Sequence, residues 1–468
     1  MSGRSRVLKN ALWLGFATGG SLITSLVYGL LAARYLGPED FGRFSLIVGV
    51  GALMANVAQG AGTSVLTVLS AQQYRPPGQL LLPGLLTQAV IGIACVALSV
   101  PLVLLLGRDR SLLVPALAYC GGSICLLMYS APVAIFRGLN KMQWSVAQPI
   151  AGLLSLVGVW LAARGRVSLD RIVAASAGAQ AAVLLIALIA TIRLYPRESH
   201  LRISSRVVSE VFRKTLGLSG VTIFQSVHWK VGTIMVQLLG GAYALGIYAA
   251  GAKPVENIRT IPMVLMLSVF PSVSQMASEG TGGLRGSQVS YITLVLALMF
   301  PAVGALIALS PTIVSLLYGR AYAEASAVLS LSLLAVIPGT VHLILIMSLV
   351  ARHAIGRLSI IYSTAIVVEV GVDALLYSRA GLVAAAIGAV VASVVTALMA
   401  DMYAFPQAPV LRERRVAKML VVGTACLGIP FTGILEHQRW MLCGLTIAAF
   451  VFAGLVLKMF PVGRAAAS

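Results

Sequence analysis

The sequence predicts an all-α integral membrane protein with about fourteen transmembrane helices. Of its 468 residues, 59% are hydrophobic and only 10% are charged, whereas a soluble domain has about 25% charged residues. Long apolar runs follow one another along the chain, and most Lys and Arg residues stand at the ends of these runs. A surface this poor in charge is stable only in lipid, so the bilayer is the expected solvent.

A helix needs about 20 mostly apolar residues to cross the hydrocarbon core of a bilayer. The first run is too long for the apolar core of a cleaved signal peptide, so we interpret it as a transmembrane helix. Several runs contain Pro or Gly, which membrane helices tolerate when neighbouring helices satisfy the freed backbone groups. The expected spans are 11–33, 43–69, 80–106, 112–135, 142–163, 171–192, 216–239, 243–275, 289–318, 322–350, 358–378, 381–404, 417–434 and 440–460.

The distribution of positive charge predicts the orientation of the chain. A net charge of +20 is common in nucleic-acid-binding proteins, but cations at the ends of apolar runs set membrane topology instead. With the N-terminus inside, the inner loops hold roughly twice as many Lys and Arg residues as the outer loops. We therefore expect both termini in the cytoplasm and no nucleic-acid partner.

The most basic loop joins the sixth and seventh expected spans. Within it, Val207, Val208, Val211 and Phe212 share one apolar face of a potential short helix. We favour an interfacial helix that lies on anionic lipid, and the alternative is a docking site for a partner.

Short motifs indicate an internal repeat of six spans. Residues 37–44 and 241–248 both read Gly-x4-Gly-x-aromatic, and each segment links the first two spans of its half. Two further pairs follow in the same order: Leu105–Arg108 with Leu317–Arg320, and Arg137 and Lys141 with Arg352 and Arg357. Six spans per half is an even number, so both halves enter from the same side and form a parallel repeat.

The repeat predicts four parts along the chain. Residues 1–194 form an N-terminal six-helix bundle, and residues 195–215 form the basic cytoplasmic loop. Residues 216–404 form a second six-helix bundle, and residues 405–468 add two C-terminal helices outside the repeat. Two bundles of this kind usually enclose a cavity that opens to alternate sides of the membrane.

Residues 33–45, ARYLGPEDFGRFS, closely resemble the opening of Wzx-type polysaccharide flippases of the multidrug/oligosaccharidyl-lipid/polysaccharide exporter superfamily. Residues 136–141 and 317–322 also look like that family. The resemblance implies a two-lobed fold and a flippase that moves undecaprenyl-pyrophosphate-linked oligosaccharide repeat units across the bacterial inner membrane. The glycan would serve exopolysaccharide, capsule or O-antigen synthesis. The implied partners are membrane lipid, a polysaccharide polymerase and export machinery, and the protein would act as a monomer.

Cations inside the spans are the candidate substrate-binding residues, because buried ionisable groups usually face a cavity or a partner. Lys230 lies in the seventh expected span, and Lys253 and Arg259 lie in the eighth. Glu256 falls about 60° from each of the latter two around the helix, so the three share one broad face. Arg34, at the end of the first span, is a further candidate. Such cations would bind the pyrophosphate of a lipid-linked sugar, whereas the alternative is an internal ion-pair cluster that Glu256 neutralises.

Glu369 and Asp373 lie one helical turn apart in the eleventh expected span, so both point the same way. Two close carboxylates in a low dielectric can share a proton or hold Na⁺. Together with Glu256 they are candidates for coupling transport to an ion. An equally acceptable interpretation is a pair satisfied by a hydroxyl such as that of Tyr377, or by a cation on another helix.

The sequence does not favour an enzyme. The cysteines form no CxxC pair or Cys/His cluster, so we expect no metal and no cofactor. A glycan polymerase or glycosyltransferase needs a large extramembrane loop or an acidic catalytic motif, and neither is visible. A cation-coupled multidrug exporter is the second transport hypothesis. It is weakened because the first span has no carboxylate and because cations within the spans would repel cationic drugs.

Overall fold

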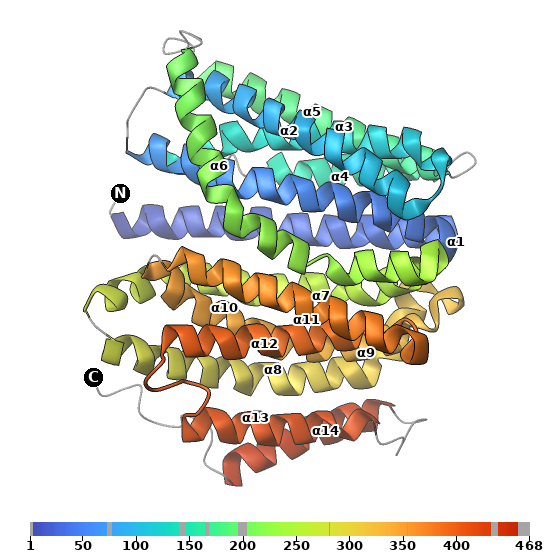
Figure 1. Ribbon diagram of the computed structural model, residues 1–468, viewed down its shortest axis with the longest axis vertical. Helices are drawn as coiled ribbons and strands as arrows, with labels where there is room; N and C mark the ends of the chain where they lie inside the picture. Colours follow the sequence, from blue (N-terminus) through green and yellow to red (C-terminus); the bar gives the residue numbers. More distant parts are fainter. Residues whose placement is uncertain are drawn as a thin grey trace. The chain divides into compact units, whose positions relative to one another are not determined.

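The structure of the chain is a computed structural model, in which every element assigned in the described residues is helical (Figure 1). The chain splits into two compact units, residues 1–246 and residues 247–468. The described residues are 3–72, 77–139, 147–163, 168–194, 204–279, 281–352, 354–431 and 439–456.

The first unit contains six helices, a short 3₁₀ helix and the start of a seventh helix. They are α1 (Gly3–Ala71), α2 (Pro77–Gly107), η1 (Arg110–Leu112), α3 (Leu113–Gly138), α4 (Ala147–Ala163), α5 (Leu169–Leu194), α6 (Ser205–His228) and the beginning of α7 (Val231–Glu279). The second unit contains the remainder of α7 and all later elements. These are α8 (Thr281–Tyr318), η3 (Arg320–Tyr322), α9 (Ala325–Leu334), α10 (Val336–Ala351), α11 (Ile355–Ala380), α12 (Val383–Ala404), α13 (Arg414–Leu427), η4 (Ile429–Phe431) and α14 (Arg439–Val456).

These helices confirm the predicted fold class, although the spans are joined in an unexpected way. Nine helical segments within the described ranges are long and apolar enough to cross a membrane, and three shorter segments are also apolar. The first two expected spans form one kinked helix, α1, whereas the expected span at 322–350 is divided into α9 and α10. The expected span at 216–239 is interrupted between α6 and α7, at Trp229 and Lys230.

The kinks in α1 and α7 occur at matching positions of the two repeats. Gly37 has φ 74° and ψ 173°, and Gly241 has φ 76° and ψ −169°. Only glycine adopts this conformation without strain, so the shared motif encodes the same sharp bend twice. A second match lies after α2 and α8, where Arg108 (φ 51°) and Gly319 (φ 86°) precede the one-turn helices η1 and η3. Lys141, of the third sequence match, lies outside the described residues.

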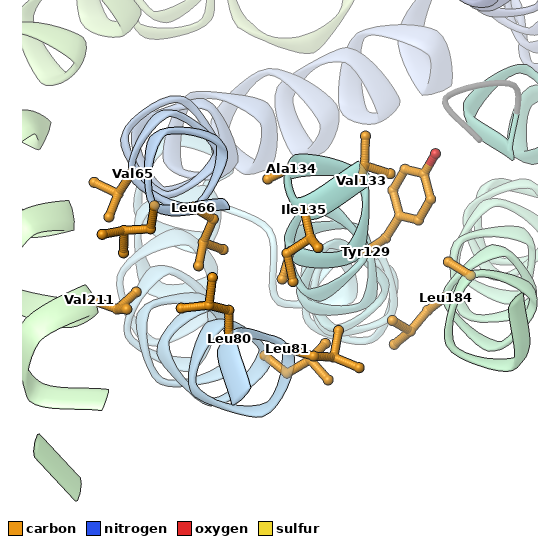
Figure 2. Packing of buried hydrophobic residues seen from close by; sticks show 14 of the residues in the cluster. Val65, Leu66, Leu80, Leu81, Tyr129, Val133, Ala134, Ile135, Leu184 and Val211 are labelled. Carbon is orange, nitrogen blue, oxygen red and sulfur yellow. The ribbon is translucent and has the colours of Figure 1, made fainter. Parts of the chain in front are cut away.

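Helix α6 packs into the core of the first unit (Figure 2). Its Val207 and Val211 are 2% and 1% exposed and join a buried cluster with Leu66 of α1, Leu80 of α2 and Ile135 of α3. Val207 and Val211 on the apolar face of the basic segment are therefore buried against protein, where we expected a helix lying on lipid, while Val208 and Phe212 are half-buried. Residues 195–203 of that segment lie outside the described part of the chain. The predicted division of the chain into four parts stays a prediction.

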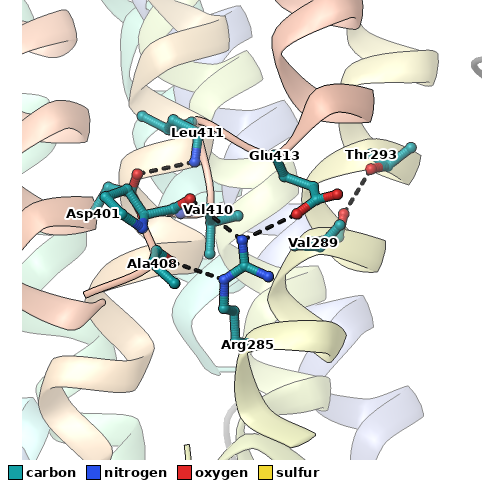
Figure 3. A network of polar contacts seen from close by, with 9 residues as sticks. Arg285, Val289, Thr293, Asp401, Ala408, Val410, Leu411 and Glu413 are labelled. Carbon is teal, nitrogen blue, oxygen red and sulfur yellow. Dashed lines mark hydrogen bonds and ion pairs between the residues drawn. The ribbon is translucent and has the colours of Figure 1, made fainter. Parts of the chain in front are cut away.

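A polar network anchors the connection between α12 and α13 in the second unit (Figure 3). Buried Asp401, near the end of α12, accepts hydrogen bonds from the backbone N–H groups of Val410 (2.8 Å) and Leu411 (2.9 Å). Arg285 of α8 donates to the Ala408 carbonyl at 2.7 Å and forms an ion pair with Glu413 at 3.0 Å. Because these contacts satisfy the polar backbone of a non-helical segment, they fix the path by which the chain enters α13.

Candidate functional site

Three charged residues of α7 that the sequence singled out lie in the second unit: Lys253, Glu256 and Arg259. The first two are in direct contact. Lys253 Nζ lies 3.2 Å from Glu256 Oε2, and the two side chains are 31% and 39% exposed. This ion pair joins residues one helical turn apart, as expected for groups on one face. Glu256 therefore neutralises Lys253 in this structure, and both groups retain access to the surroundings of the helix.

Arg259 lies one turn beyond Glu256 and is half-buried. Its guanidinium interacts electrostatically with Glu369 of α11 and with Glu256. Its Nε, however, is buried and donates no hydrogen bond within the described residues. A buried donor without an acceptor costs about 1–3 kcal/mol, so an oxygen atom from a ligand would be favourable at this position.

Glu369 and Asp373 of α11 are deeply buried, with exposed fractions of 3% and 0%. Neither carboxylate oxygen of Asp373 accepts a hydrogen bond from a described residue, so Tyr377, one of the alternative partners, does not satisfy this carboxylate. The carboxylate packs directly on Gly388 of α12, where an added Cβ would lie only 1.9 Å from Asp373 Oδ1. Glycine at residue 388 therefore gives this carboxylate the space it occupies between two helices.

Two tyrosines that sequence reasoning missed complete this group, which we call the charged cluster: Tyr248, Lys253, Glu256, Arg259, Tyr318, Glu369 and Asp373. The buried Tyr248 interacts electrostatically with Glu369, Asp373, Glu256 and Arg259. Tyr318 of α8 interacts with Glu256. A signal was present in the sequence, because Tyr248 is the aromatic residue of the second Gly-x4-Gly-x-aromatic motif and its counterpart Phe44 has no hydroxyl group. The polar cluster is thus a feature of the second repeat.

The other two candidate cations belong to the first unit. Arg34 is exposed on α1, one turn before the kink at Gly37. Lys230 is half-buried at the interruption between α6 and α7. The predicted substrate-binding role of these residues stays a prediction.

No group of three or more metal-binding side chains was found among the described residues. All five cysteines are free thiols. The charged cluster offers electrostatic interactions: its cations can bind oxyanions, and its carboxylates can bind a proton or a cation.

The comparisons with known proteins agree with this fold. The family model described as polysaccharide biosynthesis protein matches residues 7–277. The lipid II flippase MurJ, in an inward closed conformation, superposes with a TM-score of 0.75 at 14% identity, over 96% of this chain and 99% of that chain. No match was found in a comparison with curated proteins.

Two conformations of a multidrug resistance MATE family transporter of the MOP superfamily are also similar. The inward-facing structure has a TM-score of 0.64 at 15% identity, over 82% of this chain and 94% of that chain. The outward-facing structure has a TM-score of 0.61 at 13% identity, over 88% of this chain and 96% of that chain. These likenesses establish the fold, and the family match covers more than half of the chain. The chain therefore belongs to the polysaccharide biosynthesis protein family and has the multi-pass membrane fold of the multidrug/oligosaccharidyl-lipid/polysaccharide exporter superfamily, as its sequence motifs predicted.

Proposed function

We propose that this protein is a flippase that translocates undecaprenyl-pyrophosphate-linked oligosaccharide repeat units across the bacterial inner membrane by alternating access. The family membership and the fold support a transporter of this class. The main support is the environment of Arg259. This residue is a half-buried cation in a membrane helix, and its Nε–H has no acceptor within the described residues.

A pyrophosphate is the most expensive part of such a substrate to move through about 30 Å of hydrocarbon. Arg presents a planar fork of donors that matches oxyanions, and it stays charged in a buried setting. The Nε–H of Arg259, which has no acceptor within the described residues, provides a donor for a phosphate oxygen. Lys253 adds a second cation six residues earlier, about 120° away around the helix, on the broad face that Glu256 shares with both cations. The headgroup would bind at these cations while the polyprenyl chain stays in lipid.

The carboxylates of the charged cluster give this site a means of coupling to an ion. Glu369 interacts electrostatically with Arg259, so a charged Glu369 competes with the headgroup for the same cation. Binding of a proton or Na⁺ at Glu369 and Asp373 would weaken that competition and favour substrate binding at Arg259. Glu256 plays the corresponding part at Lys253, with which it forms an ion pair.

The test is complementation of a strain that lacks the protein. We expect Arg259→Ala and Lys253→Ala to abolish glycan export at normal protein levels, with lipid-linked repeat units retained on the inner face of the membrane. Unchanged export by both variants would remove these cations from the mechanism. Normal glycan export together with increased drug accumulation in the deletion strain would instead identify the second candidate, a cation-coupled multidrug exporter.

The location, orientation and partners of the protein follow from the same function. We propose an inner-membrane monomer with both termini in the cytoplasm, acting beside a polysaccharide polymerase and export machinery rather than as an enzyme. Labelling of single cysteines placed near either end of the chain with a membrane-impermeant reagent tests the orientation. Labelling in intact spheroplasts would contradict it.

A further inference from the structure

A groove on the first unit lies between the end of α1 and the middle of α6, outside the charged cluster. It has a volume of about 530 Å³ and is lined by Ser64, Val65, Val68, Leu69, Gln72, Lys214 and Gly217. The middle of its α1 wall is apolar, formed by Val65, Val68 and Leu69, and Val68 is 51% exposed. A Cβ added at Gly217 would meet no atom within 4 Å, so the α6 wall is open at this position.

Positive charge borders the groove on α6. At 100° per residue, Gly217 lies between Arg213 and Lys214 around the helix axis, so Arg213 stands beside the lining residues Lys214 and Gly217. Arg206 is on the same side of the helix but about 16 Å from Gly217 along its axis. Arg206, Arg213 and Lys214 are all exposed. Lys214 also forms an ion pair with Glu210 at 2.8 Å, which reduces but does not remove its attraction for another anion. The groove therefore combines an apolar wall with a cationic rim.

The position of the groove along the helices fits an amphiphile. Helix α1 ends at Ala71, so the groove extends to the last turn of this helix. The end of a membrane-spanning helix is expected near the interface. An acyl chain would contact Val65, Val68 and Leu69, while a phosphate group would reach the cations of α6 near the polar end. A neutral lipid would satisfy only the apolar wall, and a soluble anion only the rim.

We propose that this groove binds an anionic phospholipid, with its phosphate at Arg213 and Lys214 and one acyl chain along α1. The occupant is a bulk lipid of the bilayer and not the transported substrate. Val207 and Val211 of α6 pack in the core of the first unit with residues of α1. A lipid that contacts both helices would therefore stabilise the packing of α6 against α1.

Photo-crosslinking of the full chain in nanodiscs tests the proposal. The probes are phosphatidylglycerol and phosphatidylcholine that carry a diazirine on one acyl chain, and crosslinked peptides are identified by mass spectrometry. We expect phosphatidylglycerol to label the peptide that contains residues 64–72 about tenfold more than phosphatidylcholine does, because each cation near a membrane surface favours anionic lipid by about fivefold and Glu210 offsets part of this.

Variants separate the two parts of the site. Arg213→Ala/Lys214→Ala should abolish the preference for phosphatidylglycerol and leave labelling by both lipids, whereas Gly217→Leu should fill the groove and reduce labelling by both. Glu210→Gln should increase the preference because it releases Lys214. The matched control is Arg414→Ala/Arg415→Ala, which removes two exposed cations from α13 and should have no effect on this peptide.

Three results would overturn the proposal: equal labelling by the two lipids in the unaltered protein, an equal loss of preference in the α13 control, or displacement of the probe by undecaprenyl phosphate more readily than by unlabelled phosphatidylglycerol. The last result would make the groove a substrate site. None of these results depends on export activity, so the proposed function and the lipid site fail independently.

Discussion

Gly42 and Gly246 pack against each other's motif through backbone atoms, and the contact is reciprocal. A Cβ at Gly42 would lie 1.7 Å from the Ala242 carbonyl oxygen, and a Cβ at Gly246 would lie 1.8 Å from the Pro38 carbonyl oxygen. Pro38 and Ala242 each directly follow the kinked glycine of their motif, Gly37 and Gly241. The two repeat motifs thus meet as equivalent partners, at the close backbone approach that small residues permit in membrane helices.

Substitution of either glycine should therefore destabilise the protein. We expect Gly42→Ala and Gly246→Ala each to cost about 1–3 kcal/mol, because the added methyl group meets a carbonyl that cannot move without its helix. Thermal unfolding in detergent measures the loss. Gly121→Ala in α3 is the control, since a Cβ there meets nothing within 4 Å. Equal melting temperatures for all three variants would mean that the contact is not maintained in the protein.

Asp401 should be essential for the connection between α12 and α13. Asp401→Ala leaves the N–H groups of Val410 and Leu411 without their acceptor, at a cost of about 1–3 kcal/mol for each buried donor. Asp401→Asn keeps one acceptor oxygen and should cost about half as much. Limited proteolysis near residues 405–413 reports the release of this segment, and resistance equal to that of the unaltered protein in Asp401→Ala would contradict the assignment.

Variants of Arg259 can show whether this residue binds substrate or only neutralises the charge of Glu369. If its role is to bind an oxyanion, Arg259→Ala should abolish export and Arg259→Ala/Glu369→Gln should remain inactive. If Arg259 serves only to neutralise Glu369, the double variant should recover export, because it removes both charges together. We expect no recovery, as measured by glycan export at matched protein levels. Glu369→Gln alone is the control for the second substitution.

Gly388 should influence transport through Asp373. Gly388→Ala places a methyl group where the Asp373 carboxylate now lies, and the end of that side chain can move aside with little cost to stability. We expect a melting temperature close to that of the unaltered protein, but transport with an altered dependence on pH or Na⁺. Gly371→Ala, where a Cβ meets nothing within 4 Å, is the control on α11. An unchanged ion dependence in Gly388→Ala would remove Asp373 from coupling.

The sequence by itself determined the membrane class, the location of the apolar helices and the repeated bend, whereas the joining and division of the expected spans appeared only in the structure. Long apolar runs can satisfy their backbone in lipid only as helices, and the two glycine motifs encode the same bend because positive φ is a local property of the residue. The Lys253–Glu256 pair was also predictable, because residues three apart on a helix share a face.

Only the tertiary structure decided which helices bring their polar groups together. The interaction of Arg259 with Glu369 joins residues of α7 and α11 that are far apart in the chain, and the place of Asp373 depends on the missing side chain at Gly388 of α12. Periodicity gives the face of a helix that a residue occupies, but the partner of that face is set by packing. The same reason explains α6: its apolar face is compatible with either lipid or protein, and tertiary packing places Val207 and Val211 of that face in the core.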